Sequence, residues 1–166
     1  MTFANTPAGT SLFVHANIFI HHFGWDPVMQ PLCQQLLERI ARQELAGFTS
    51  THALSEMAHR LMTLEAINVN GLPATGIAQQ LRKNPAEVQK LTRFRQAIQG
   101  IPQFGIQVLA IPEPLLDVAA AISQSLGLLT NDALIVAVMQ ANGLTNVAST
   151  DPDLDRVPGI TRYAPA

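Results

Sequence analysis

The chain has few of the residues from which small proteins build covalent or metal cross-links. Its 166 residues include a single cysteine, Cys33, so no intramolecular disulfide can form. Leucines surround this cysteine at positions 32, 36 and 37, which indicates a buried thiol rather than a nucleophile. A chain of this length can bury a sizeable core without disulfides or structural zinc. We therefore predict one domain, spanning residues 11–166, that is held together by hydrophobic packing.

The sequence also lacks the short motifs of common nucleotide and zinc sites. It has no Gly-x-Gly-x-x-Gly segment and no phosphate loop, which removes most support for a nucleotide-binding fold. Its five histidines include no His-Glu-x-x-His pair, and His21 and His22 are adjacent and point apart on a predicted helix. The apolar run 12–20 is interrupted by polar residues and has no basic residue before it. It fits neither a secretory signal nor a membrane span, so we expect a cytoplasmic protein.

Charge is scarce as well. Charged residues make up 13% of the chain and apolar residues 48%, so few charges cover the surface and we expect a homodimer or a tight partner. The net charge of −2 means that any contact with RNA must rest on a local patch. A candidate patch holds half of the ten positive charges: Arg82, Lys83, Lys90, Arg93 and Arg95. A solvated helix face is an equally good interpretation of this segment.

Short apolar runs alternate with amphipathic patterns along the chain. Residues 1–10 lack periodicity and are expected to form a loose, flexible N-terminal tail. Strands are predicted at 12–14, 47–50, 106–111, 146–149 and 160–163. Helices are predicted at 16–23, 28–45, 76–83, 86–99, 115–126 and 132–140, with another after the second strand, and residues 68–104 read as a helical insertion. This alternation predicts a three-layer α/β/α sandwich with a central, mostly parallel sheet of about five short strands.

Polar side chains gather where the predicted strands end. They follow the first and fourth strands, open the buried helix near residue 132, or lie on the helix after the second strand: His15, Asn17, Glu56, Asp132, Thr150, Asp151 and Asp153. Ligands of parallel sheets bind beyond the carboxyl ends of the strands. Convergent carboxylates repel one another and imply a bound cation, and oxygen ligands suit Mg²⁺ or Mn²⁺.

Each acid also has an ordinary structural interpretation. Asp132 would stabilise the start of its helix, and Glu56 would be one more charge on a helix face between His52 and Arg60. Asp151-Pro152-Asp153 is a typical turn sequence. These interpretations leave open an unrelated α/β module whose acids are only caps and turns.

Four segments, in this order, carry a family resemblance. They are residues 12–20 (LFVHANIFI), 51–58 (THALSEMA), 128–135 (LLTNDALI) and 148–157 (ASTDPDLDRV). Together they resemble the PIN family of nucleases, which includes the toxins of VapBC-type toxin–antitoxin pairs, over residues 11–163. The resemblance implies a metal-dependent endoribonuclease that is restrained by a small antitoxin. It also implies that Glu56, Asp132 and Asp151 are catalytic metal ligands, with Asn17, Thr150 and Asp153 in support.

The family has Asp where this chain has His15. A neutral imidazole is a poor ligand of Mg²⁺ but an acceptable one of Mn²⁺ or Zn²⁺, and it removes one negative charge from the site. Three hypotheses follow: an altered metal preference with His15 as a ligand, a weakened nuclease, or a catalytically inactive PIN-like domain that binds RNA or a protein partner. An engineered Asp→His substitution would give the same sequence.

Overall fold

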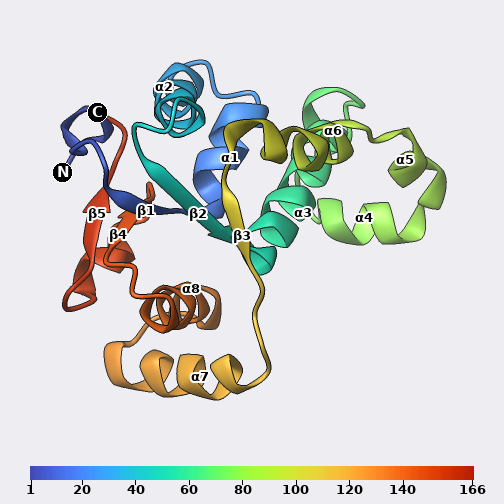
Figure 1. The fold of residues 1–166 in the computed structure, drawn as a ribbon. Coiled ribbons are helices and arrows are strands. Elements are labelled where there is room, and N and C mark those ends of the chain that lie inside the picture. Colours follow the sequence, from blue (N-terminus) through green and yellow to red (C-terminus); the bar gives the residue numbers. More distant parts are fainter.

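A five-stranded sheet forms the centre of the computed structural model, which describes residues 1–166 (Figure 1). The strands are β1 (Ser11–Val14), β2 (Ala46–Ser50), β3 (Gln107–Leu109), β4 (Asn146–Ala148) and β5 (Thr161–Tyr163). Their order is β3-β2-β1-β4-β5, and every neighbouring pair is parallel. Helices lie on both faces of this sheet, which confirms the predicted α/β/α sandwich.

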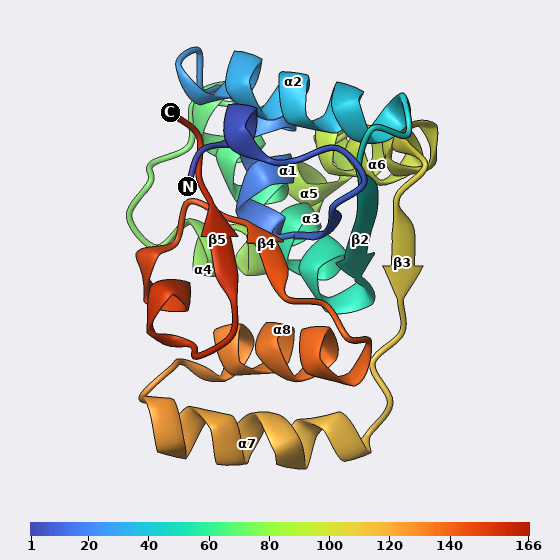
Figure 2. The same ribbon diagram turned by 60° about the vertical axis from the view of Figure 1, so that its left-hand side comes forward.

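Eight α-helices connect and cover the strands. They are α1 (Ala16–Phe23), α2 (Met29–Ala41), α3 (Thr51–Asn68), α4 (Ile77–Lys83), α5 (Pro85–Lys90), α6 (Arg93–Gly100), α7 (Pro114–Leu126) and α8 (Thr130–Ala141). Short 3-10 helices are present at η1 (Phe3–Asn5), η2 (Ile101–Phe104) and η3 (Pro152–Arg156). Figures 1 and 2 place α1, α2 and α3 on one side of the sheet and α7 and α8 on the other.

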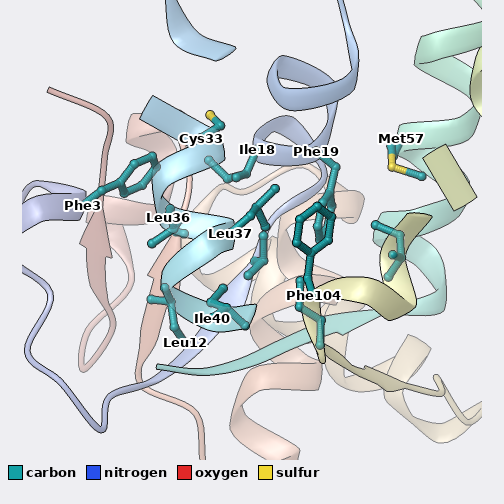
Figure 3. Close-up of a cluster of buried hydrophobic side chains, with 14 of the residues drawn as sticks. Phe3, Leu12, Ile18, Phe19, Cys33, Leu36, Leu37, Ile40, Met57 and Phe104 are labelled. Carbon is teal, nitrogen blue, oxygen red and sulfur yellow. The ribbon is translucent and has the colours of Figure 1, made fainter. Parts of the chain in front are cut away.

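The central strand β1 divides the hydrophobic core into two parts. Leu12 and Val14 belong to the core under α1 and α2, whereas Phe13 belongs to the core under α8. All three are fully buried, because successive strand residues point to opposite faces and both faces are covered. In the first core, Leu36 and Leu37 of α2 pack near Leu12 (Figure 3).

Helix α8 is buried nearly all round, as its apolar sequence predicts. Residues 132–139 are all buried, because the sheet covers one side of α8 and α7 packs along the other. No single helix is long and apolar enough to cross a membrane; α7 and α8 meet that test only together, and the chain bends by 116° between them. The outer face of α7 leaves Leu116 and Val118 exposed.

Two predicted helices have different bounds in the structure. The helix predicted at 28–45 ends at Ala41, and Gln43 then adopts a positive φ of 59° that no α-helix allows. The helix predicted at 86–99 is divided into α5 and α6 at Leu91 and Thr92. The segment 68–104, predicted as a helical insertion, thus holds three short helices and η2.

The first residues are packed rather than loose, which differs from the expected tail. Phe3 is buried, and Thr2 forms a parallel bridge with Ala164 beside β5. Arg39 of α2 donates hydrogen bonds to the carbonyl oxygens of Phe3 (2.8 Å) and Thr6 (2.7 Å). These contacts are long-range, so the local composition of residues 1–10 gives no sign of them.

Candidate active site at the carboxyl ends of the central strands

Strands β1 and β4 lie side by side, and this brings two segments of the chain together. His15 follows β1, and residues 149–151 follow β4. The backbone N–H of His15 donates to the carbonyl oxygen of Ala148 at 3.1 Å, which extends the parallel ladder by one bond. His15 precedes the first residue of α1 and is only 5% exposed. The carboxyl ends of neighbouring parallel strands therefore form the floor of the site.

The hydroxyl of buried Ser149 organises this floor. Its Oγ accepts hydrogen bonds from Asn17 Nδ2 (3.0 Å) and from the backbone N–H of Asp151 (3.0 Å). His15 Nδ1 lies 3.1 Å from the same oxygen. A serine hydroxyl has two acceptor positions and one hydrogen, so with both positions used it donates to His15 Nδ1. The neutral ring of His15 therefore carries its proton on Nε2.

His15 is held in its neutral form. Burial lowers the pKa of His15 to about 4, against an opposing effect from the nearby carboxylate of Asp151. A nitrogen that coordinates a metal must be free of its proton. In this hydrogen-bond arrangement His15 presents an N–H donor where the resemblance implies an acidic ligand.

Three carboxylates from three elements, Glu56, Asp132 and Asp151, lie near enough to one another to interact electrostatically. Asp132, in the first turn of α8, is 9% exposed, and its pKa is raised to about 6 by burial and then by repulsion from Asp151 and Glu56. Glu56, in the second turn of α3, is half-buried, and its pKa is raised by burial, with His52 opposing and Asp151 adding to the shift. Glu56 Oε2 is buried without a hydrogen-bond partner. The cluster thus concentrates negative charge that the protein itself leaves uncompensated.

The other predicted acidic residues are partly committed to local structure. Asp151 Oδ1 accepts the backbone N–H of Asp153 at 2.9 Å and caps η3, as its turn sequence predicts. Asp153 forms an ion pair with Arg156 at 2.5 Å. Thr150 is fixed through its backbone N–H, which donates to Asn17 Oδ1 at 3.4 Å. Asn17 therefore ties the end of β4 to the start of α1.

No three His, Cys, Asp or Glu side chains are close enough together to coordinate one metal ion in the structure. The chemistry of the donors nevertheless fits a hard divalent cation. Glu56, Asp132 and Asp151 offer carboxylate oxygens, which are the ligands that such a cation prefers. One of these oxygens, Glu56 Oε2, has no hydrogen-bond partner within the protein. A cation would also remove the repulsion that raises the pKa of Asp132.

The sequence did not predict the roles of two residues at the candidate site, Ser149 and His52. Ser149 is the acceptor that joins His15, Asn17 and Asp151, and its only sequence signal is a position between a buried strand and Thr150. His52 lies one turn before Glu56, and its Nε2 is buried without a partner. The i, i+4 spacing of His52 and Glu56 is visible in the sequence. The sequence does not show that this face of α3 is directed towards the site.

The predicted basic patch is spread over three helices. Four of its members are exposed: Arg82, Lys83, Lys90 and Arg95. Lys90 pairs with Glu87 at 2.6 Å. The fifth, Arg93, faces inward, with its guanidinium 4.6 Å from the centre of the Trp25 ring and a hydrogen bond to the carbonyl oxygen of Phe23. The structure therefore separates Arg93 from the exposed charges.

A parallel α/β sandwich with acids gathered at the carboxyl ends of its central strands defines the class of this protein. Residues 12–160 match the family model of the PIN domain, and the chain belongs to the PIN domain family. A comparison with curated protein sequences found no match.

Solved structures of similar fold include three with toxin–antitoxin descriptions. VapBC2 from Rickettsia felis, bound to a DNA fragment from its promoter, has 14% identity and a TM-score of 0.58, covering 92% of this chain and 97% of that chain. VapC20 of Mycobacterium tuberculosis, a Sarcin-Ricin loop cleaving toxin, has 16% identity and a TM-score of 0.57, with 87% and 93% covered. A toxin–antitoxin complex from Klebsiella pneumoniae has 16% identity and a TM-score of 0.55, with 91% and 95% covered. At these identities the likeness concerns the fold.

Proposed function

We propose that this PIN domain is a divalent-metal-dependent endoribonuclease of the toxin type. The observation that carries the proposal is the convergence of Glu56, Asp132 and Asp151, with two raised pKa values and a buried, unpartnered oxygen. Family membership and the likeness to VapC20 support the choice of RNA as the substrate. Groups with strongly perturbed pKa values tend to mark functional sites.

Glu56, Asp132 and Asp151 would hold Mg²⁺ or Mn²⁺. When bound, such an ion lowers the pKa of a coordinated water and stabilises charge on a phosphodiester. Asn17 and Ser149 keep the end of β4 in place, and with it Thr150 and Asp151. The Nε2–H of His15 is oriented by Ser149 and supplies a neutral hydrogen bond to a phosphate oxygen, in place of a charge on the metal.

Partners follow from the same proposal. The exposed basic residues of α4, α5 and α6, which are Arg82, Lys83, Lys90 and Arg95, contact the RNA backbone. A small antitoxin restrains the activity, as the toxin–antitoxin complexes of similar fold suggest. The exposed apolar residues of α7, Leu116 and Val118, suit a homodimer contact.

Cleavage of a mixed RNA pool tests the proposal. The purified protein is incubated with Mg²⁺, Mn²⁺ or EDTA beside two variants, Asp132→Asn and Asp117→Asn. Asp117 is exposed in the first turn of α7 and outside the site, so it controls for contaminating nuclease and for the substitution itself. We expect cleavage by the parent and by Asp117→Asn only when metal is present, and at least a hundredfold less by Asp132→Asn, since a metal ligand is lost. Cleavage that persists in EDTA or in Asp132→Asn contradicts the proposal.

A second function is favoured by His15 alone: a PIN-like domain that binds RNA or a protein partner without cutting. A protonated Nε2 removes one ligand from the site and leaves a donor. RNA binding with no cleavage in any metal, together with strong cleavage by His15→Asp, would establish this second function.

A further inference from the structure

The largest cavity of the molecule opens beside the acidic cluster. It has a volume of about 370 Å³, within the range of small-ligand sites, and is formed by α1, the loop after it and α3. Asn17 belongs both to the cavity wall and to the hydrogen-bond network around Ser149. Arg60, another wall residue, lies one helical turn after Glu56 on α3. The cavity and the cluster are therefore neighbours that share α1 and α3.

The cavity contains a fixed aromatic surface. Trp25 lines it, and the guanidinium of Arg93, which does not, lies 4.6 Å from the centre of the ring. Arg93 is itself held by a hydrogen bond of 3.1 Å to the carbonyl oxygen of Phe23. Cation–π contact with Arg93 stabilises this position of the indole. The contact thus favours the orientation in which part of the ring lines the cavity.

The remaining wall combines one free positive charge with amide and apolar groups. The side chain of Arg60 is exposed and has no ion-pair or hydrogen-bond partner in the structure. The carboxylate of Asp26 is already engaged by His21 Nδ1 (2.9 Å) and by the backbone N–H groups of residues 28 and 29. Asn17 and Asn68 add side-chain amides, and Leu64 adds an apolar surface. This set of groups matches an aromatic base attached to a phosphate.

We propose that this cavity binds one unstacked nucleotide of single-stranded RNA next to the scissile phosphate, with its base against Trp25 and its phosphate on Arg60. The position beside the cluster rests on the proposed nuclease function; the binding itself does not require cleavage. Single-stranded RNA is recognised through splayed bases that stack on aromatic side chains, whereas the bases of a duplex are already stacked. The cavity therefore selects single-stranded over double-stranded RNA.

Trp25 is the only tryptophan, so its fluorescence reports on this cavity alone. The full-length protein is titrated in EDTA, which prevents metal-dependent cleavage, with a short single-stranded RNA and with the same sequence as a duplex. We expect the single strand to quench the emission and the duplex to have a much smaller effect. Binding of the same RNA with a fluorescent label, followed by anisotropy, gives affinities for the variants.

Trp25→Ala is expected to weaken binding of the single strand by about tenfold, and Trp25→Phe by less, because stacking is partly kept. Arg60→Ala is expected to weaken it by about tenfold through the loss of one charged phosphate contact. Arg42→Ala is the matched control: this exposed arginine follows α2 at the amino end of β2, away from the cluster, and its affinity should equal that of the parent. Circular dichroism melting checks that each variant is folded.

Unchanged emission on addition of RNA, or losses of affinity in Arg60→Ala no larger than in Arg42→Ala, would overturn the nucleotide site. Equal quenching by duplex and single strand would overturn it too. Metal-dependent cleavage is measured separately on the same preparation. Cleavage without quenching removes this site and leaves the nuclease; quenching without cleavage in any metal removes the nuclease and leaves this site.

Discussion

His15 lies at the end of the central strand, and its contribution depends on which ring nitrogen carries the proton. Ser149 accepts from Asn17 and Asp151 and so donates to Nδ1, which leaves the proton on Nε2. Because the buried ring is neutral, the protein avoids the cost of burying a positive imidazolium at this position. Compared with an aspartate at this position, the neutral ring takes one negative ligand away from the proposed metal site and lowers the repulsion among the acids.

Replacing His15 by Asp should therefore have opposite effects with and without metal. The Ser149 hydroxyl can donate to the new carboxylate, so the network survives, but a fourth negative charge joins the cluster. In EDTA we expect a lower melting temperature than in the parent. With Mg²⁺ we expect a larger metal-induced rise in melting temperature and cleavage faster by on the order of tenfold or more.

His15→Asn is the control for this substitution, because it keeps an acceptor for Ser149 and adds no charge. Differential scanning fluorimetry in EDTA and in Mg²⁺, beside the RNA cleavage assay, separates the two variants. Equal behaviour of His15→Asn and His15→Asp would show that removal of the imidazole, and not the added carboxylate, controls the site.

Asp132 makes the protein less stable at neutral pH, and Asp132→Asn should reverse this. Its folded-state pKa of about 6 lies above the ordinary value of 3.8, so the folded state binds more protons and stability falls as the pH rises through this window. In EDTA at pH 7 we expect Asp132→Asn to be more stable by roughly 2 kcal/mol, with little gain below about pH 3, where the carboxyl is protonated in both states. Urea unfolding at several pH values measures the difference.

The His15 ring acts in the opposite direction, since its pKa is lowered to about 4 in the folded state. Its contribution to stability is lost as the pH falls from 6.5 towards 4, so the parent curve combines both effects. The difference between parent and Asp132→Asn isolates the carboxyl. Asp117→Asn should follow the parent curve; a gain at pH 7 that persists unchanged at low pH would mean that Asp132 acts through packing.

The three candidate acids can be identified in the sequence, but the hydrogen-bond network around Ser149, which includes only Asp151 among them, cannot. Glu56, Asp132 and Asp151 follow or flank buried elements, and such positions are visible as polar residues beside apolar runs. The role of Ser149 depends on hydrogen-bond donors in α1 and in its own loop. It also depends on a contact with His15, which is 134 residues away in the chain. No local pattern encodes the proton position on His15.

At the scale of elements, a buried carboxylate links the start of α6 to α3, beside the hydrophobic contacts that pack the segment 77–104 against the domain. Glu65 of α3 is 7% exposed and accepts the backbone N–H groups of Thr92 and Arg93 at 2.9–3.1 Å. Both N–H groups belong to the start of α6 and have no partner within that helix. Glu65 thus caps α6 from another helix, and the negative charge suits the positive end of the α6 dipole.

Glu65→Ala should loosen α6 and destabilise the protein by roughly 2–3 kcal/mol, because two part-buried N–H groups lose a charged acceptor. Glu65→Gln keeps an acceptor oxygen and should lose less. Urea unfolding gives the free energies, and hydrogen exchange at Thr92 and Arg93 reports on the cap itself. Glu87→Ala, which removes a pair with exposed Lys90 and a charge in the first turn of α5, should change stability by less than Glu65→Ala, by about 0.5 kcal/mol. Protection at Arg93 that is unchanged in Glu65→Ala would refute the capping role.

The same carboxylate explains why one predicted helix was wrong. The apolar spacing in residues 86–99 continues through Leu91 and predicts a single helix, and Leu91 is indeed buried. The break at Thr92 is fixed by an acceptor 27 residues earlier in the chain. Some helix ends are marked by local residues, such as Pro114 and Gly127 around α7. The predicted ends of these helices lie within one or two residues of the ends in the structure.

At the scale of the whole molecule, residues near the two ends of the chain are joined beside β5. The carbonyl oxygen of Met1 accepts the backbone N–H of Ala164 at 2.8 Å, and Phe3 N–H donates back to the Ala164 carbonyl at 3.0 Å. The sequence pattern predicted the layers and the parallel sheet, because both follow from alternating periods. It did not predict this pairing, since bridges between distant segments leave no local periodicity.

Phe3 should consequently matter to global stability despite its place in a segment with no predicted structure. It is 7% exposed and belongs to the core under α2, with Arg39 bound to its carbonyl oxygen. Phe3→Ala should lower the free energy of unfolding by about 3 kcal/mol through lost burial and the cavity left behind. Thr2→Ala, which keeps the backbone bridge and removes a side chain without hydrogen bonds, should change it by less than about 0.5 kcal/mol. Urea unfolding measures the stability of both variants. Faster hydrogen exchange at Ala164 in Phe3→Ala would show that the pairing depends on this side chain. Equal stabilities of the two variants would mean that Phe3 contributes nothing to the core.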